Sequence, residues 1–169
     1  IPAMSKNIPV IIKNTFNPTA KGTLISKENT NSELRVQGIS SIDEVSLITV
    51  QGSGMIGEAG ISMRLFRAVA EASINVILIT QCSSEHSITF AVLPNEAQKS
   101  KDALNKEFEM ELKSGLIDSI KVENNLSIIA AVGENMKNIP GVASKFFNAL
   151  SINGIKVVAI AQGASELNI

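Results

Sequence analysis

The sequence has no tryptophan, no tyrosine and only one cysteine, Cys82. Without Trp and Tyr it lacks the side chains on which nucleic-acid-binding proteins often stack bases. A single cysteine excludes an intramolecular disulfide and a thiolate metal cluster, and it fits a reducing cytosol. The net charge is −1, from 15 basic and 16 acidic residues, so no excess positive charge attracts nucleic acid or an anionic membrane surface.

Long apolar runs are missing too, and none approaches the roughly 20 residues that a membrane-spanning helix needs. Hydrophobic residues nevertheless make up 44% and charged residues 18% of the 169 residues. This composition is sufficient for a packed core and argues against intrinsic disorder. The length allows one large domain or two small ones.

Two stretches of the chain repeat one another. Residues 45–88 align with residues 126–169 without a gap, at a constant offset of 81. A gapless match of this length indicates a tandem module. The matching pairs are Gly52 with Gly133, Met55 with Met136, Gly60 with Gly141, Phe66 with Phe147, Gln81 with Gln162, and Ser84-Glu85 with Ser165-Glu166. Because the second copy stops early and the first residues are Ile1-Pro2, we expect a piece of a longer protein.

The first copy and the residues after it predict a ferredoxin-like βαββαβ module of the α+β class. Strand composition occurs at residues 45–50, 74–80, 86–94 and 119–122. Two helices are expected from apolar residues at helical spacing, with the second helix ending at Gly115. Their apolar stripes are Ile61, Leu65, Val69 and Ala72 in the first, and Ala97, Leu104, Phe108 and Leu112 in the second.

The second copy predicts a truncated module of the same kind. It has a strand at residues 126–132, a helix with an apolar stripe of Val142, Phe146 and Leu150, and a strand at residues 155–161. The domain boundaries that we expect are a linker at 1–33, a first module at 34–124 and an incomplete second module at 125–169.

The residues before the first copy add two hypotheses. Residues 8–12 are apolar and predict a strand, which could pack on the second module so that the first is inserted between. Residues 34–39 and 45–50 have strand composition, and the break at residues 40–44 could be a hairpin turn.

Gly52, Gly54 and Gly57 spell G-x-G-x-x-G between a strand and a helix. One interpretation is a dinucleotide site, which would need an acidic residue at the end of the following strand; Gln81 and Cys82 are there instead. The simpler interpretation is that glycines bring backbone N–H groups near a helix N-terminus, where a small carboxylate is as favourable as a phosphate.

No catalytic or metal site is predicted. His86 has no companions at metal-ligand spacing, and Cys82 has no His–Asp pair to activate it. Gln81 and its equivalent Gln162 each end an apolar strand, so each amide needs partners: a local turn, a ligand or a neighbouring module. Glu85 and Glu166 are too far apart to form an acid/base pair, and we interpret them as one structural or binding feature that is used twice.

Residues 50–90 and their counterpart 132–166 resemble the tandem ACT regulatory region of aspartate kinases (aspartokinases). The pair LITQ-SSE and AIAQG-SE is most similar to the threonine-sensitive class that is often fused to homoserine dehydrogenase. Residues 6–26 resemble the segment that joins the kinase core to the regulatory region. The kinase motifs have no match, so the resemblance implies a catalytic domain upstream of Ile1, with ATP and Mg bound there and no cofactor in this piece.

The resemblance also implies a function: an end-product amino acid binds between ACT modules that pair side by side and inhibits the parent kinase, which phosphorylates L-aspartate in the cytoplasm. A homodimer through these modules is implied as well. Lysine-sensitive relatives place an acidic residue where Ile77 stands, so the implied effector is threonine. The alternative is a dimerisation scaffold without a ligand. By position, the effector-binding residues are Gly54, Met55, Gly57, Asn75, Val76, Gln81 and Gln162.

Overall fold

The computed structural model describes two compact units, Ile1–Arg35 and Val36–Ile169. The residues described are 2–26, 36–82, 85–133, 136 and 140–161.

The first unit is a small hairpin. A short helix, α1 (Pro2–Ser5), precedes β1 (Val10–Ile12), which pairs antiparallel with β2 (Thr23–Ile25). These two strands form a sheet of their own. Within this unit the hydrogen-bonding partner of residues 10–12 is β2, and the hypothesis that residues 8–12 pack on the second module stays a prediction.

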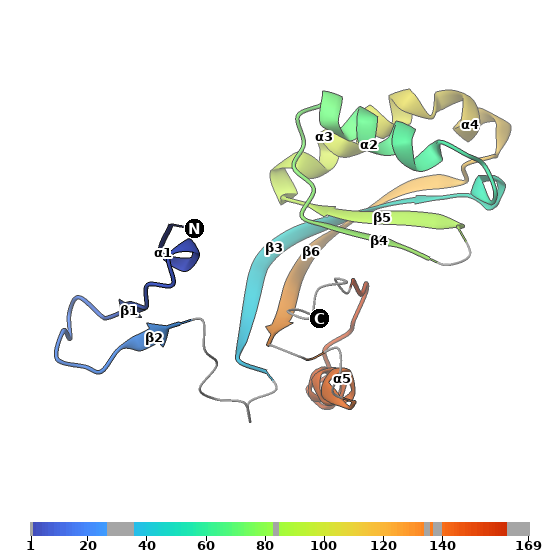
Figure 1. Ribbon diagram of the computed structural model, residues 1–169. Coiled ribbons are helices and arrows are strands. Elements are labelled where there is room, and N and C mark those ends of the chain that lie inside the picture. The colour runs from blue at the N-terminus through green and yellow to red at the C-terminus, as the bar shows by residue number, and fades with distance from the viewer. Residues whose placement is uncertain (1, 27–35, 83–84, 134–135, 137–139, 162–169) are drawn as a thin grey trace. The chain divides into compact units, whose positions relative to one another are not determined.

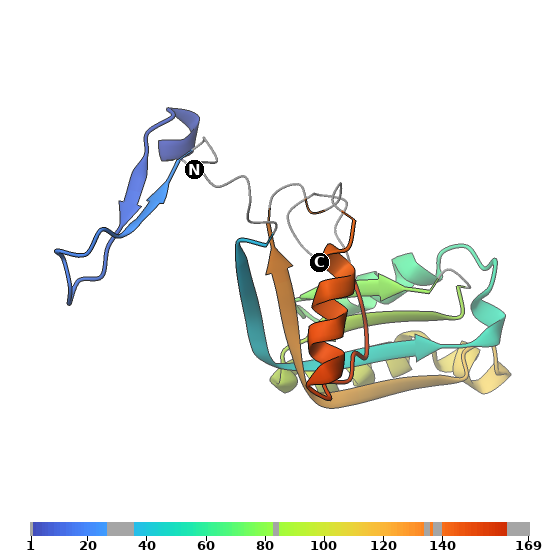
Figure 2. The ribbon, with the colours of Figure 1, turned by 90° about the horizontal axis from the view of Figure 1, so that it is seen from below.

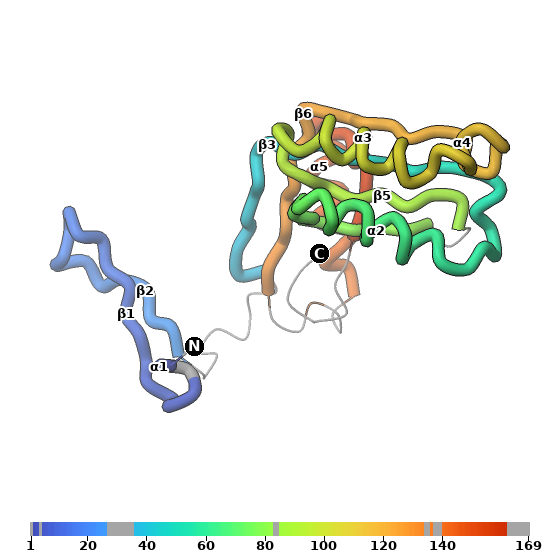
Figure 3. The backbone as a smooth tube through the Cα atoms, turned by 90° about the horizontal axis from the view of Figure 1, so that it is seen from above, coloured from blue at the N-terminus to red at the C-terminus, as the bar shows by residue number. Residues whose placement is uncertain are grey.

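The second unit contains a four-stranded sheet of order β4-β5-β3-β6, in which all neighbours are antiparallel. Figures 1 and 3 show α2, α3 and α4 together on one face of this sheet. This is the predicted ferredoxin-like α+β arrangement, and we call it the first module. In chain order the elements of the whole second unit are β3 (Gly38–Gln51), η1 (Ser53–Met55), α2 (Ile61–Glu71), β4 (Leu78–Gln81), β5 (Ser87–Val92), η2 (Pro94–Glu96), α3 (Ala97–Glu107), α4 (Glu109–Ser114), β6 (Ser119–Val132) and α5 (Val142–Ile152).

The core of the first module lies between the helices and the sheet. The predicted stripe of α2 is confirmed, with Leu65 and Val69 at 0% and 1% exposure. On the second helical segment Leu104 and Phe108 are both fully buried, as is Phe90 of β5. Each such side chain stabilises the fold by about 1.5–3 kcal/mol relative to an exposed one, so these helix faces hold the layers together.

The second predicted helix is interrupted at Phe108, where α3 ends and α4 begins. The interruption coincides with a hydrogen bond from Arg64 Nη2 to the backbone oxygen of Glu107, at 3.0 Å. A side chain that takes a helical carbonyl weakens the regular backbone ladder and bends a helix. The predicted end is confirmed: α4 stops before Gly115, which has a left-handed φ of 78°.

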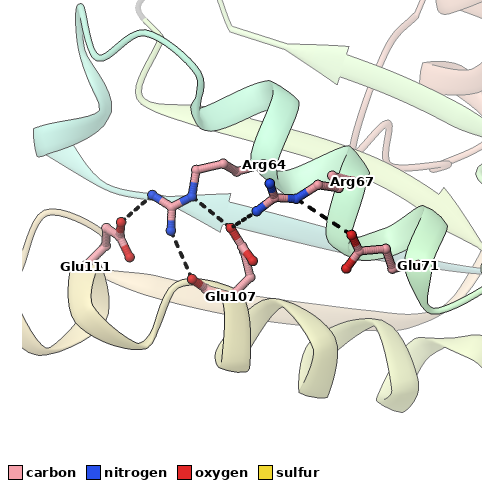
Figure 4. Close-up of polar contacts among 5 residues, drawn as sticks. All are labelled: Arg64, Arg67, Glu71, Glu107 and Glu111. Carbon is pink, nitrogen blue, oxygen red and sulfur yellow. Dashed lines mark hydrogen bonds and ion pairs between the residues drawn. The ribbon is translucent and has the colours of Figure 1, made fainter.

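Arg64 connects α2 to this interruption through an ion-pair cluster, which Figure 4 shows. Its Nε donates to Glu107 Oε1 at 2.8 Å, and its Nη1 donates to the carboxylate of Glu111. The guanidinium also lies 4.9 Å from the ring centroid of Phe108. The hydrogen bonds from Arg64 lower the pKa of both glutamates and raise that of Arg64 itself. Arg67 adds a second bond to Glu107, at 3.1 Å.

Strands β3 and β6 are each 14 residues long and pair along their whole length. The predicted turn at residues 40–44 is wrong, because β3 continues through it with register shifts on either side of Val45. β6 likewise joins the two strands that were predicted separately at 119–122 and 126–132. Both strands therefore run out of the first module toward α5, as Figure 2 shows. We call their outer halves, α5 and residues 155–161 the second module.

The ladder between β3 and β6 has an internal twofold relation. Val45 pairs with Leu126, and these two residues begin the two copies of the repeat. The pairs on either side of this central pair are related by the 81-residue offset. For example, the pair of Leu47 and Glu123 becomes the pair of Ile128 and Ile42 when each residue is replaced by its equivalent in the other copy. Two serines at equivalent positions bond across the junction: Ser46 Oγ to Asn124 Oδ1 and Ser127 Oγ to the backbone oxygen of Asp43, both at 2.7 Å.

The helices follow the same offset. α2 and α5 both have 11 residues, and each of their ends differs by 81. Each helix follows a left-handed glycine, Gly60 with a φ of 94° and Gly141 with a φ of 89°. Met55 and Met136 are both 4% exposed. The duplication in the sequence is therefore a duplication in space. Residues 155–161, which were predicted to form a strand, form no ladder within the described part of the chain.

Two glycines after β3 allow a close approach to the segment before β6. A Cβ on Gly52 would lie 2.6 Å from Ile117 Cα, and a Cβ on Gly54 would lie 2.8 Å from Leu116 Cα. Neither position requires a positive φ. Gly57 is different, because its φ is 72° and a Cβ there would meet nothing within 4 Å. Gly52 and Gly54 therefore serve packing, and Gly57 serves the turn.

Arg64→Met is expected to lower the free energy of unfolding by about 1–2 kcal/mol, less than the loss of a partner from a fully buried ion pair, because Arg64 is 30% exposed. Urea denaturation measures this. Arg67→Met, in which the lost side chain is 50% exposed, should cost no more than about 0.5 kcal/mol. An equal cost for both variants would contradict a special role for Arg64.

The same contribution should depend on pH. The folded-state pKa values of Glu107 and Glu111 lie below the ordinary 4.5, so the stability that they contribute is present above pH 4.5 and is lost as the pH falls through the folded-state values. The unfolding free energies of wild type and Arg64→Met should therefore converge in acid. A constant difference down to acid pH would show that packing alone explains the effect.

Gly52→Ala is expected to destabilise the chain by about 2–4 kcal/mol, because the added methyl group meets backbone atoms that cannot rotate away. Gly57→Ala should cost about 1 kcal/mol, which is the cost of a left-handed φ for alanine. Gly38→Ala is the control, since Gly38 has open space and no positive φ, and it should change stability by less than about 0.5 kcal/mol. Thermal unfolding ranks the three variants, and equal shifts would refute this ranking.

Candidate functional site

The glycine-rich loop follows β3 at one end of the sheet and leads into α2. The side chain of Met55 is buried in the core, so Met55 offers a ligand only its backbone. The N–H of Met55 donates to the backbone oxygen of Gly52 at 3.2 Å, and the backbone oxygen of Met55 accepts a hydrogen bond from the N–H of Glu58 at 3.2 Å. Gly57 stands at the exposed tip between these turns. Of the three predicted loop residues, Gly57 is thus the one that presents its backbone most openly.

A carboxylate of the chain itself is bound at this tip. The N–H of Gly57 donates to Glu85 Oε2 at 3.0 Å. Glu85 lies in the turn between β4 and β5, has a left-handed φ of 57°, and donates its own N–H to the backbone oxygen of Cys82 at 3.0 Å. The sequence identified Glu85 only as a repeated residue. Its pairing with Gly57 spans 28 residues, and only the recurring Ser-Glu pattern pointed to it.

Gln81 lies at the same end of the sheet as the loop. It is the last residue of β4 and pairs with Ile88 of β5, whose neighbour Ser87 pairs with Gln51 at the end of β3. The side chain of Gln81 is exposed, so its amide is open to a ligand or a second module. Gln162 lies outside the described residues.

Asn75 and Val76 lie at the other end of the sheet, just before β4. The N–H of Ile77 donates to the backbone oxygen of Ala91 at 2.8 Å, and the N–H of Asn75 lies 3.5 Å from Glu96 Oε1. Asn75 is exposed, whereas Val76 is half-buried against the core. The four residues of β4 separate the two ends by about 10 Å. A single module therefore does not bring Asn75 and Val76 together with Gly54 and Gly57.

The second module contains an apolar groove with a volume of about 670 Å³. It lies between β6, α5 and residues 155–161, with Ile77, Leu78 and Ile79 of the first module also in its wall. Thr80 Oγ1 donates to the backbone oxygen of Ile160 at 3.0 Å and joins the two modules beside it. By the 81-residue offset, the groove is the counterpart of the space that β5 fills in the first module. Of the predicted effector residues, those that the structure describes do not line it.

The described residues contain no group of three or more His, Cys, Asp or Glu side chains placed to hold a metal ion. His86 and Cys82 are both exposed. Among the described residues no helix has the length and apolar character needed to cross a bilayer.

Comparison with known proteins identifies the repeat. The sequence profile of the ACT domain family matches residues 48–108 and 129–169, more than half of the chain. A bifunctional aspartokinase/homoserine dehydrogenase of Haemophilus influenzae is 45% identical over 168 residues, which are 99% of this chain and 21% of the relative. A chloroplastic bifunctional aspartokinase/homoserine dehydrogenase of Arabidopsis thaliana is 43% identical over 174 residues, which are 100% of this chain and 19% of the relative.

Solved structures of aspartate kinases have the same fold. The enzyme of Clostridium acetobutylicum superposes with a TM-score of 0.80 at 27% identity, over 99% of this chain and 38% of that one. E. coli aspartokinase III in complex with lysine and aspartate superposes with a TM-score of 0.70 at 27% identity, over 99% of this chain and 36% of that one.

The chain spans about a fifth of the length of the curated relatives that it matches. The matched part contains both copies of the repeat, with the paired helices and the glycine loop described above. The chain belongs to the ACT domain family, as an ACT regulatory region of the aspartokinase type.

Proposed function

We propose that this region binds an end-product amino acid, threonine, and transmits feedback inhibition to an aspartate kinase. The similarity to bifunctional aspartokinase/homoserine dehydrogenases along the whole chain supports this proposal. So does the structure of E. coli aspartokinase III in complex with lysine and aspartate, which has the same fold. The effector would favour one packing of the modules over another, with a coupling free energy of about 1–3 kcal/mol.

The single observation that carries the proposal is the separation of the two backbone segments. Gly54 and Gly57 lie where β3 ends, and Asn75 and Val76 lie where β4, parallel to β3, begins. A twofold axis perpendicular to the strands reverses their direction, so it brings the loop of one copy beside the start of β4 in the other. An effector held by both segments thus requires a second module, which we assign to the partner in a homodimer. β4 is an edge strand, and Ile79 on it is 51% exposed, as such pairing needs.

The side chains near this site favour threonine over lysine. Ile77 is apolar and half-buried at the position where a lysine site would use an acidic residue. The exposed amide of Gln81 can both donate a hydrogen bond to a hydroxyl and accept one from it. We assign the effector's carboxylate and amine to backbone groups of Gly54, Met55, Gly57, Asn75 and Val76.

We place the catalytic machinery outside this chain. The parent protein would transfer phosphate from ATP to L-aspartate in an upstream kinase domain that holds the Mg, and it would carry homoserine dehydrogenase as the bifunctional relatives do. The exposed thiol of Cys82 suits a reducing compartment. That compartment is the cytoplasm in our proposal, while the Arabidopsis relative is chloroplastic by name.

A second function is a dimerisation scaffold without a ligand. The exposed apolar side chains of the β4 edge and of residues 155–161 favour it, since they would be covered in a dimer without any effector.

Gln81→Ala is expected to weaken threonine binding about tenfold, because one hydrogen bond to the effector contributes about 1.4 kcal/mol. Folding should be unaffected, as the side chain is exposed. Calorimetry on the 169-residue chain measures the affinity. Gln98→Ala is the control, since Gln98 is exposed on α3 and donates a hydrogen bond to Asp102 of the same helix, so it should bind threonine like wild type. Unchanged affinity in Gln81→Ala would remove Gln81 from the site.

A panel of threonine, lysine, methionine and homoserine separates sensing from scaffolding. Threonine at 100 times its Kd should stabilise the chain by about 2.7 kcal/mol, and the melting temperature should rise with its concentration. Analytical ultracentrifugation in parallel reports the dimer. A stable dimer whose melting temperature ignores all four amino acids would establish the scaffold and refute the sensor.

A further inference from the structure

We propose that Glu85 is an internal competitor for the carboxylate of the effector. This inference rests on the proposed function, in which Gly57 offers its backbone N–H to that carboxylate. In the structure this N–H already donates to Glu85 Oε2 at 3.0 Å. An amino acid that binds at the loop must therefore replace one carboxylate by another, with no change in charge at the N–H.

The geometry makes this replacement feasible. Gly57 and Glu85 are both exposed, so water and ligand reach their hydrogen bond. No cation forms an ion pair with Glu85 within the described residues, and its ties are the bond to Gly57 and a backbone bond to Cys82. A carboxylate held by one solvent-exposed hydrogen bond exchanges readily, because such a bond contributes little net free energy.

The release of Glu85 from Gly57 would affect the rest of the site. Glu85 closes the turn that starts directly after Gln81, and its left-handed φ of 57° is uncommon for a residue with a side chain. The adjacent backbone is tied to the loop through the N–H of Gly52, which donates to the backbone oxygen of His86 at 3.0 Å. When the effector displaces Glu85, the turn loses its side-chain tie to the loop, whereas the backbone bond from Gly52 to His86 remains. The exchange thus links effector binding to Glu85 and to the backbone between β4 and β5 that it ties to the loop.

The proposal predicts that Glu85→Ala binds the effector more tightly than wild type. If the loop N–H is free of Glu85 about a fifth of the time, removal of the competitor lowers the apparent Kd for L-threonine about fivefold. Calorimetry on the 169-residue chain measures this. Glu58→Ala is the matched control, because it removes the same charge from the residue next to Gly57 without freeing the N–H, and it should leave the Kd unchanged. Glu85→Gln, which keeps an acceptor oxygen but no charge, should be intermediate.

The amide proton resonance of Gly57 provides a readout that does not depend on any effector. It should move upfield in Glu85→Ala and stay in place in Glu58→Ala. If wild type binds none of the amino acids while this resonance moves as described, the proposed function has failed and Glu85 is a structural tie of the loop. If wild type binds threonine and Glu85→Ala binds it equally or more weakly, competition is refuted, and weaker binding means that Glu85 contacts the effector itself.

Discussion

The antiparallel ladder between β3 and β6 supports both modules, because each of these 14-residue strands runs from one into the other. The outer half of β3 forms hydrogen bonds with the outer half of β6, which is the first strand of the second module. In the same way, the inner half of β6 forms hydrogen bonds with the inner half of β3, which is the first strand of the first module. The ladder turns about the pair Val45 and Leu126, and buried Ser46 closes one side of the junction. The helices, the loops and the groove all take their positions from this one ladder.

The glycine-rich loop shows how one motif can serve two purposes. Gly52 and Gly54 are needed because the backbone before β6 comes too close for any side chain. Gly57 has free space and an exposed N–H. The second copy of the repeat keeps the first of these glycines, at Gly133, and not the other two. The packing of Gly52 and Gly54 explains the G-x-G part of the motif without a nucleotide.

Several features were predictable because they depend on local periodicity. The stripe of Leu65 and Val69 gives the buried face of α2, and the 81-residue offset gives the bounds of α5. The joined strands were not predictable, since residues 40–44 are mostly polar and look like a turn until β6 pairs with residues 40–42. The interruption at Phe108 and the bond between Gly57 and Glu85 were also hidden, because their partners are distant in sequence. The predicted effector residues follow from a family resemblance, and the separation of Gly54 and Gly57 from Asn75 and Val76 at two ends of the sheet is visible only in three dimensions.

The shared ladder is an exchange of strands within a single polypeptide. Neither copy of the repeat is a self-sufficient folding unit, although each has its own helix and loop. A cut between Asn124 and Asn125 would divide β6. Each fragment would then have a sheet edge that the other fragment covers in the intact chain. A strain that twists one half of the ladder is also carried along covalent backbone into the other half. The duplication has therefore produced two modules on one shared ladder, so that a distortion of one module is transmitted to the other.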